Sequence, residues 1–381
     1  MAARGFAIAS RYNTAVIFSR AFFLSLFLAI ALAAAPAMGQ VPPASGDTSP
    51  APTRPKIGLV LSGGGARGAA HIGVIKVLEE LRIPIDVIAG SSMGALVGAA
   101  YASGTSAKEL EERLLEQDWD RLLTDESPRV DRSFLRKEED QNRLLRLELG
   151  VKADGVRLPP GAISGQKFDS LFSQITRNAP PSVKFDELPI PFRAVATDAE
   201  SGRMVVFDQG RLVDAMRASM SVPGAIAPYQ IGEHIYLDGG LTRNLPVDVA
   251  RQMGADVVIV VNIGTPLLKK QDIQSLVGVS LQMVNILTEQ NVRSSIESLH
   301  ATDHLISPPL DTIGASDFRL VGDAINIGAA TTRSMSARLA ALSLTPEQYA
   351  AVRNSQLARA PAPIGDRERI AEVRVAGLER A

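Results

Sequence analysis

The stretch KIGLVLSGGGARG, residues 56–68, joins an apolar run to a glycine-rich turn, and this junction decides the fold. Residues 56–62 are rich in β-branched and other apolar side chains, which predicts a buried strand. Residues 66–81 place apolar side chains at helical spacing, which predicts a helix directly after the turn. A buried strand followed by a helix is the repeating unit of proteins with a largely parallel sheet.

The same alternation of strands and helices continues along the chain. Further strands are predicted at 85–89, 192–197, 204–207, 235–237 and 256–262, and further helices at 93–101, 106–117, 168–175, 272–299 and 321–342. The charged stretch 118–149 is expected to form a surface excursion. We therefore expect an α/β fold with a mainly parallel central sheet flanked by helices.

The composition excludes several classes of function. The formal net charge is −1, and Lys and Arg are scattered, so no nucleic-acid partner is expected. The absence of cysteine excludes disulfides, a thiolate nucleophile and Cys-ligated zinc. The histidines are too few for a His-rich metal centre, and neither a metal nor a cofactor is expected; they are His71, His234, His300 and His304.

Residues 1–39 have the layout of a signal peptide. Three arginines precede an apolar run over 21–35, and no acidic residue occurs before Asp47. The run is shorter than the roughly 20 residues that span a bilayer, so cleavage after Ala37 or Gly39 is expected in place of a membrane anchor. Export to the periplasm, the outer membrane or cell surface, or the medium would follow. Residues 40–55, rich in Pro, Ala and Ser, read as a disordered linker.

The glycine-rich turn GGGARG admits two functions. Gly63, Gly65 and Gly68 fit the Gly-x-Gly-x-x-Gly pattern of a dinucleotide site, and a non-enzymatic nucleotide-binding module is the alternative function. Such a site requires an acidic residue at the end of the second strand, whereas Asp86 lies at the start of that strand. An oxyanion hole uses the same backbone amides for the tetrahedral intermediate of acyl transfer.

The sequence GSSMG, residues 90–94, follows the strand predicted at 85–89 and precedes a helix. This is the context of a nucleophile elbow, with Ser92 as nucleophile and with Gly90 and Gly94 permitting the sharp turn. Ser91 is its neighbour and not the centre of the motif.

The sequence DGG, residues 238–240, follows the short strand predicted at 235–237. An Asp-Gly pair alone is more often a plain turn. In company with the other two motifs, Asp238 is interpreted as the general base, supported by Gly239 and Gly240.

These ordered motifs resemble those of the patatin-like phospholipases, particularly the bacterial branch. Two further segments strengthen the resemblance: RASMSVP at 217–223 and NLPV at 244–247. The resemblance covers about residues 56–342, and it implies a three-layer patatin-like fold, with the domain placed at 56–345. It also implies a phospholipid or membrane-surface substrate, with phospholipase A or lysophospholipase activity.

The resemblance further implies a Ser–Asp dyad that forms an acyl-enzyme. By motif position, Ser92 is the nucleophile and Asp238 the base. Gly64 and Gly65 would donate their amides to the oxyanion, within the loop from Gly63 to Gly68, and Arg67 would steady that loop.

A catalytic triad would require a histidine after the acid, and the candidates His300 and His304 both read as structural. His71, on the helix after the glycine loop, also reads as a packing residue, although it could face the site. A carboxylate can replace the histidine as base if it contacts the serine directly and burial raises its pKa.

Two segments leave alternatives open. The apolar side chains of 272–299 either line an acyl groove or serve ordinary helix packing, which is the commoner explanation. Residues 346–381 are predicted to be a linker that ends in a strand-like run at 370–378. That run is either an edge strand or, as we expect, the opening strand of a truncated POTRA domain. It resembles the patatin-type autotransporters, which continue into an outer-membrane barrel. The sequence gives no prediction of the oligomeric state.

Overall fold

The computed structural model of the chain describes residues 54–125, 134, 150–152, 155–157, 161–264 and 266–359. The predicted signal peptide, most of the linker after it, most of the charged excursion and the run at 370–378 lie outside these residues, and they stay predictions. The described residues from Pro55 onward belong to one compact unit.

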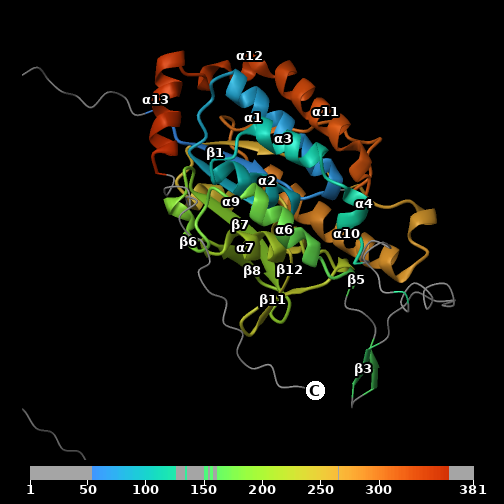
Figure 1. The fold of residues 1–381 in the computed structure, drawn as a ribbon. Coiled ribbons are helices and arrows are strands. Elements are labelled where there is room, and N and C mark those ends of the chain that lie inside the picture. Colours follow the sequence, from blue (N-terminus) through green and yellow to red (C-terminus); the bar gives the residue numbers. More distant parts are fainter. Residues whose placement is uncertain are drawn as a thin grey trace, which may run out of the picture. The chain divides into compact units, whose positions relative to one another are not determined.

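An eight-stranded sheet forms the centre of this unit, in the order β11-β12-β7-β2-β1-β13-β14, with β8 also paired to β7 (Figure 1). Neighbours among β7, β2, β1, β13 and β14 run parallel. The pairs β7–β8, β7–β12 and β12–β11 are antiparallel. The strands are β1 Ile57–Leu61, β2 Val87–Ser91, β7 Phe192–Asp198, β8 Met204–Phe207, β11 Tyr229–Ile231, β12 His234–Asp238, β13 Val257–Val261 and β14 His304–Ile306.

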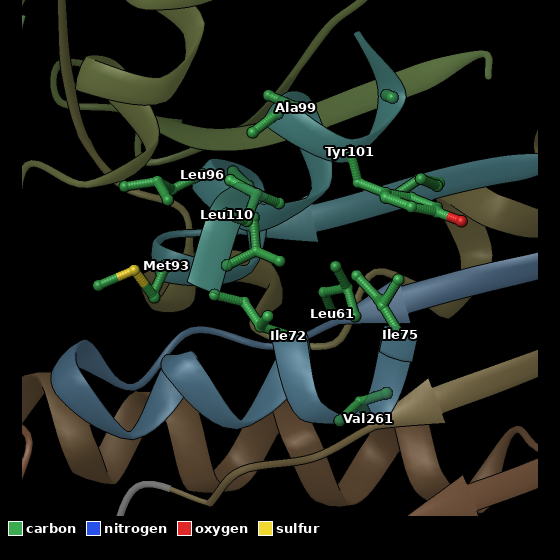
Figure 2. Packing of buried hydrophobic residues seen from close by; sticks show 14 of the residues in the cluster. Leu61, Ile72, Ile75, Met93, Leu96, Ala99, Tyr101, Leu110 and Val261 are labelled. Carbon is green, nitrogen blue, oxygen red and sulfur yellow. The ribbon is translucent and has the colours of Figure 1, made fainter. Parts of the chain in front are cut away.

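Helices cover both faces of the sheet, because its central strands bury side chains on both sides. Successive side chains of a strand point to opposite faces, and in β1 Leu59 and Leu61 join one core while Val60 joins the other. Figure 2 shows the first core, where Ile72 and Ile75 of the helix after β1 pack near Leu61. The second core lies under the segments that carry Val247–Gln252 and Val292. The prediction of a three-layer α/β fold with a mainly parallel sheet is confirmed.

The helices are short, with one exception of 22 residues, α10. None within the described residues is long and apolar enough to cross a membrane. They are α1 Ala70–Glu80, α2 Met93–Ala102, α3 Ala107–Leu115, α4 Trp119–Leu122, α6 Gln166–Ile175, α7 Leu212–Ser219, α8 Gly240–Arg243, α9 Val247–Gln252, α10 Leu276–Glu297, α11 Val321–Ser334, α12 Ser336–Leu339 and α13 Pro346–Leu357. Short 3₁₀ turns are η1 Gly65–Ala69, η3 Phe185–Glu187, η4 Lys270–Asp272, η5 Phe318–Leu320 and η6 Ala340–Leu342.

Three small ribbons lie outside the main sheet: β3 with β4, β5 with β10, and β6 with β9. They are β3 Gly150–Lys152, β4 Gly155–Arg157, β5 Gly161–Ile163, β6 Val183–Lys184, β9 Gln209–Gly210 and β10 Gly224–Ile226. Of these, β10 follows the RASMSVP segment and pairs in parallel with β5.

Helix α13 corrects the prediction that the chain is a linker from 346 onward. Thr345 caps this helix in a capping box with Gln348, and Pro346 occupies its first turn. A Thr-Pro pair with Gln three residues after the cap is a local signal for the start of a helix. The helix is also attached to the core, because the Gln356 Nε2 donates a hydrogen bond of 2.7 Å to the carbonyl oxygen of Ile85.

Candidate active site

The register of the sheet brings two of the predicted catalytic segments together. Ser91, the last residue of β2, pairs with Val195 of β7, and Ala196 of β7 pairs with Asp238 of β12. Neighbouring strands lie about 4.8 Å apart. The end of β12 is therefore two strands away from the end of β2, although 146 positions separate Ser92 from Asp238 in the sequence.

Ser92 occupies a strained turn between β2 and α2. Its φ is 52° and its ψ is −123°, a backbone region that residues with a side chain rarely adopt. The neighbouring glycines make this turn possible. A Cβ at Gly94 would lie 2.2 Å from the carbonyl oxygen of Leu61, and one at Gly90 would lie 2.5 Å from that of Gly94. The predicted elbow geometry is thus present at Ser92.

Ser219 holds the elbow in place. The Ser92 amide donates a hydrogen bond of 2.8 Å to the Ser219 Oγ, whose own hydrogen goes to the carbonyl oxygen of Val195 at 2.6 Å. Ser219 is the first of the two serines in the RASMSVP segment, to which the family resemblance assigned no role. No local pattern predicts this role, because the bond joins residues that are 127 positions apart.

Asp238 is buried at the end of β12, with 3% of its surface exposed. The Gly240 amide donates a hydrogen bond of 2.7 Å to its Oδ1, and the Thr197 hydroxyl donates one of 2.9 Å to its carbonyl oxygen. Burial raises the pKa of the Asp238 carboxyl from 3.8 to about 6, and interactions with the Ser92 hydroxyl and the Gly240 amide oppose this effect by lowering the pKa. The carboxyl is therefore largely ionised at neutral pH and close to the range that favours a general base.

The Ser92 hydroxyl is near enough to Asp238 to lower the pKa of the carboxyl. The Asp238 Oδ2 nevertheless makes no hydrogen bond of standard geometry to any described residue. The two side chains are therefore close to each other without an aligned hydrogen bond. Catalytic hydrogen bonds are often long or poorly aligned before substrate binds.

The glycine turn after β1 packs directly against the elbow. A Cβ at Gly63 would lie 2.7 Å from the Ser92 Cβ. The Gly63 amide donates a hydrogen bond of 2.9 Å to the Oδ1 of the buried Asn244, and the Asn244 amide donates one of 2.8 Å to the Asn291 Oδ1 of α10. Since Asn244 occupies the Gly63 amide, this amide is not available to an oxyanion. Asn244 is the asparagine of NLPV, and its role as a clamp on the turn was not predicted.

The Gly64 and Gly65 amides, unlike that of Gly63, are available as hydrogen-bond donors. Neither Gly64 nor Gly65 donates a hydrogen bond to another residue in the part of the chain that the structure describes. Gly65 has a φ of +61°, and a Cβ there would lie 2.1 Å from the carbonyl oxygen of Ala315. That same carbonyl accepts the Ala66 amide at 2.8 Å. The turn is thus held by Ala315 on one side and Asn244 on the other, while the Gly64 and Gly65 amides have no acceptor among the described residues.

Arg67 and Gly68 continue the turn into η1. Arg67 is buried, and burial lowers the pKa of its guanidinium, an effect that the charge of Asp311 opposes. Its Nε and Nη1 make no hydrogen bond within the described residues. A Cβ at Gly68 would lie 2.1 Å from the Met93 Cγ, so a glycine here lets η1 lie against the start of α2.

The histidines lie away from the dyad or serve structure. His71 is fully buried, and its Nε2 lies 2.7 Å from the carbonyl oxygen of Ser62. Burial lowers its pKa to about 4, so the ring is neutral at physiological pH. His304 lies on β14, at the opposite edge of the sheet from β12, and the His300 Nδ1 lies 3.1 Å from the Arg251 Nη2. His234 is exposed at the start of β12, and its Nδ1 lies 3.3 Å from the Asp198 Oδ2. None of the four histidines, all of which are described, is thus placed for a triad with Asp238.

The alternative dinucleotide site finds no acidic residue where it requires one. Asp86 precedes β2, and its Oδ2 accepts the Ile57 amide at 2.8 Å, at the end of β1 remote from the glycine turn. The described residues also contain no group of three or more His, Asp or Glu side chains that could hold a metal ion.

Comparison with known proteins decides the family. Residues 59–251, which contain all three motifs, match the family model of the patatin-like phospholipases. This chain belongs to the patatin-like phospholipase family. The match includes the elbow, the Asp238 strand and the Asn244 clamp.

Curated patatin-like relatives share only part of their length with this chain. The rat patatin-like phospholipase domain-containing protein 7 is 34% identical over 211 residues, which are 55% of this chain and 14% of the relative. An uncharacterised NTE-family protein of Mycobacterium tuberculosis is 36% identical over 211 residues, or 55% of this chain and 49% of the relative. The match therefore spans about half or less of the relatives' length.

Solved structures show a weaker likeness to this patatin-like chain. VipD from Legionella pneumophila aligns with a TM-score of 0.37 at 15% identity, covering 74% of this chain and 67% of VipD. The type III effector ExoU aligns with a TM-score of 0.36 at 18% identity, covering 80% of this chain and 53% of ExoU.

Proposed function

We propose that this patatin-like chain is a lipid-acyl hydrolase that cleaves fatty-acyl esters of phospholipids, with Ser92 as nucleophile and Asp238 as general base. One observation carries the proposal: a serine in a strained turn lies next to a buried carboxyl whose pKa is raised to about 6. The family membership supports a lipid ester as the substrate class.

In the first half of the proposed reaction, the Ser92 Oγ attacks the acyl carbonyl carbon while Asp238 accepts the serine proton. The negative charge that develops on the carbonyl oxygen is stabilised by the Gly64 and Gly65 amides, which have no acceptor among the described residues. Collapse of the tetrahedral intermediate breaks the ester bond. The departing alcohol takes the proton from Asp238, and the fatty acyl group stays on the Ser92 Oγ.

In the second half, a water molecule gives a proton to Asp238 as it attacks the acyl-enzyme. The same amides stabilise the second tetrahedral intermediate. When it collapses, the Ser92 Oγ recovers its proton from Asp238 and the fatty acid leaves. Asp238 thus starts and ends each half reaction ionised, which is the form that its pKa supports near neutral pH.

The proposal is tested by measuring fatty-acid release from phospholipid by the purified protein with a metal chelator present. We expect Ser92→Ala and Asp238→Asn each to lower the rate by about 1000-fold or more, because each removes one half of the proton transfer. The matched control is Ser91→Ala, which changes the adjacent serine and should retain substantial activity. Both active-site variants should remain folded and unfold in a cooperative transition.

Two outcomes would contradict the proposal. Full activity in Ser92→Ala would show that Ser92 is not the nucleophile. Full activity in Asp238→Asn together with loss of activity in His304→Ala would indicate a catalytic triad. Saturable binding of a dinucleotide without any ester hydrolysis would instead favour the nucleotide-binding alternative.

A further inference from the structure

One face of α10 exposes a continuous row of apolar side chains. We call these residues the α10 stripe: Leu276, Val279, Met283, Ile286 and Leu287. Their spacing of three or four residues places them on one side of the helix. Leu276 is 76% exposed and Met283 is 61% exposed, so they are not covered by neighbouring elements. Ordinary helix packing, the explanation favoured from the sequence, does not account for them.

Exposed large hydrophobic side chains are concentrated in and just before the α10 stripe. The described residues contain ten large hydrophobic side chains that are exposed, and six of them lie between Leu267 and Leu287. Single exposed hydrophobic residues are normal on a protein surface, but a contiguous apolar patch marks an interaction surface. The α10 stripe, extended by Leu267, is such a patch.

The charges around the stripe indicate the chemistry of its partner. No charged residue occurs from Ile273 to Thr288. Two exposed lysines, Lys269 and Lys270, and the exposed Asp272 stand just before the helix, so the net charge of this segment is positive. An uncharged apolar face with lysines at its margin is typical of helices that lie in a lipid surface, where the lysines attract anionic headgroups.

The stripe is continuous with the candidate active site. Just after it, the Thr288 hydroxyl and the Asn291 side-chain amide donate hydrogen bonds of 3.1 Å and 2.8 Å to the carbonyl oxygen of Gly240. The Gly240 amide in turn holds Asp238. Leu276 is about 18 Å along the helix axis from Thr288, at 1.5 Å per residue. The helix therefore connects an exposed apolar surface to the loop that positions Asp238.

We propose that the α10 stripe is the surface by which this protein docks onto anionic lipid bilayers. The stripe enters the headgroup–acyl boundary, Lys269 and Lys270 contact the headgroups, and the anchored helix holds the Asp238 loop at the lipid surface. This inference rests on the proposed function for its lipid partner, but docking itself requires no turnover. The two can therefore be tested separately.

Docking is measured in the Ser92→Ala background, so that no lipid is consumed. The protein is sedimented with vesicles of phosphatidylglycerol and phosphatidylcholine, and with vesicles of phosphatidylcholine alone. The double variant Leu276→Gln/Met283→Gln should bind both kinds about 100-fold more weakly, at about tenfold for each apolar side chain. Lys269→Gln/Lys270→Gln should weaken binding about fivefold for each lysine, on the anionic vesicles only.

The matched control is Leu115→Gln/Leu357→Gln, which removes two exposed leucines from α3 and α13 and should bind as the parent does. Glutamine keeps a high helix propensity, and circular dichroism should show unchanged helix content. In the active protein, the stripe substitutions should lower vesicle hydrolysis relative to hydrolysis of a water-soluble short-chain ester, whereas the control substitutions should leave that ratio unchanged.

Unchanged vesicle binding by the stripe variant would overturn the docking inference. So would a dimer, seen by sedimentation velocity without lipid, that the stripe substitutions dissociate, because a second copy of the chain would then cover this face. Failure of the proposed function looks different: neither ester would be hydrolysed in a Ser92-dependent manner, while stripe-dependent vesicle binding would persist.

Discussion

At the scale of single residues, the site holds two groups in states that oppose folding. The positive φ of Ser92 costs about 1–3 kcal/mol relative to an unstrained turn. The buried carboxyl of Asp238 resists ionisation. Both features make chemical sense in a hydrolase: the turn presents the hydroxyl, and the raised pKa makes the carboxylate a stronger base.

The raised pKa of Asp238 predicts the pH dependence of activity. The base must be ionised to accept the serine proton, so kcat/KM should rise with pH through about 6 and then level off. The measurement is a pH profile on a water-soluble ester, whose chemistry is independent of lipid binding. A rate that falls as pH rises from 5 to 7 would show that the acting group is needed in its protonated form.

The same shift predicts that Asp238→Asn stabilises the protein at neutral pH. Because the pKa is 3.8 in the unfolded chain and about 6 in the folded one, the stability contribution of this group is fully present below pH 4 and is lost as pH rises through 6. The asparagine side chain does not ionise, so its contribution to stability does not change over this pH range. The free energy of unfolding of the variant should therefore exceed that of the parent by up to about 3 kcal/mol at pH 7, and this gain should shrink toward zero near pH 4.

Urea titrations of both proteins at several pH values measure this difference. His71, whose pKa is lowered to about 4, also titrates in this range, but it is present in both proteins and cancels in the comparison. If Asp238→Asn were less stable than the parent at pH 7, the ionised Asp238 carboxylate would be stabilising the folded protein.

At the scale of elements, the glycine turn is shaped by contacts from three separate segments. Ser92 of the elbow, Asn244 of the NLPV segment and Ala315 of the loop before η5 all touch it. The turn combines a positive φ with close packing, and these two demands can be separated by substitution.

Gly65→Ala is expected to abolish activity, and Gly232→Ala is its matched control. Both glycines have a φ of +61°, but a Cβ at Gly65 would meet the Ala315 carbonyl at 2.1 Å, whereas one at Gly232 would meet nothing within 4 Å. Gly232→Ala should thus cost only about 1–2 kcal/mol of stability, with activity retained. Gly65→Ala should lower kcat by about 100-fold or more, because the turn must move and the oxyanion donors move with it.

Urea denaturation and ester turnover of the two variants provide the measurement. Equal activity in the two would mean that the position of the turn does not matter for catalysis.

The elements were largely predictable because their signals are local. The strands at β1, β2, β7 and β13 and the motifs at their ends follow from periodicity and from Gly, Ser and Asp at fixed offsets. Helix α13 was not predicted, although its signal is also local: the capping box is present in the sequence. The predicted helix at 321–342 is instead divided into α11, α12 and η6, and no Gly or Pro stands at the break around Met335 to indicate it.

At the scale of the whole molecule, the site depends on pairings between segments that are far apart in the chain. The register Ser91–Val195 and Ala196–Asp238 brings the segments of Ser92 and Asp238 together, and the Ser219 and Asn244 hydrogen bonds join residues that are similarly far apart in the chain. A single sequence carries no signal for such pairings, because each partner's side chain is also compatible with a surface position. The family motifs predicted Ser92 and Asp238 as partners, whereas the contacts of Ser219 and Asn244 required the three-dimensional structure.

The most direct test of the Ser92–Asp238 pair is covalent labelling with a fluorophosphonate, located by peptide mass spectrometry. The reagent reacts with a serine that an adjacent base activates. We predict one adduct on the peptide that contains Ser92, equal labelling in Ser91→Ala, and labelling slowed by about 1000-fold in Asp238→Asn. An adduct on another serine, or labelling of Asp238→Asn at the parent's rate, would contradict the account.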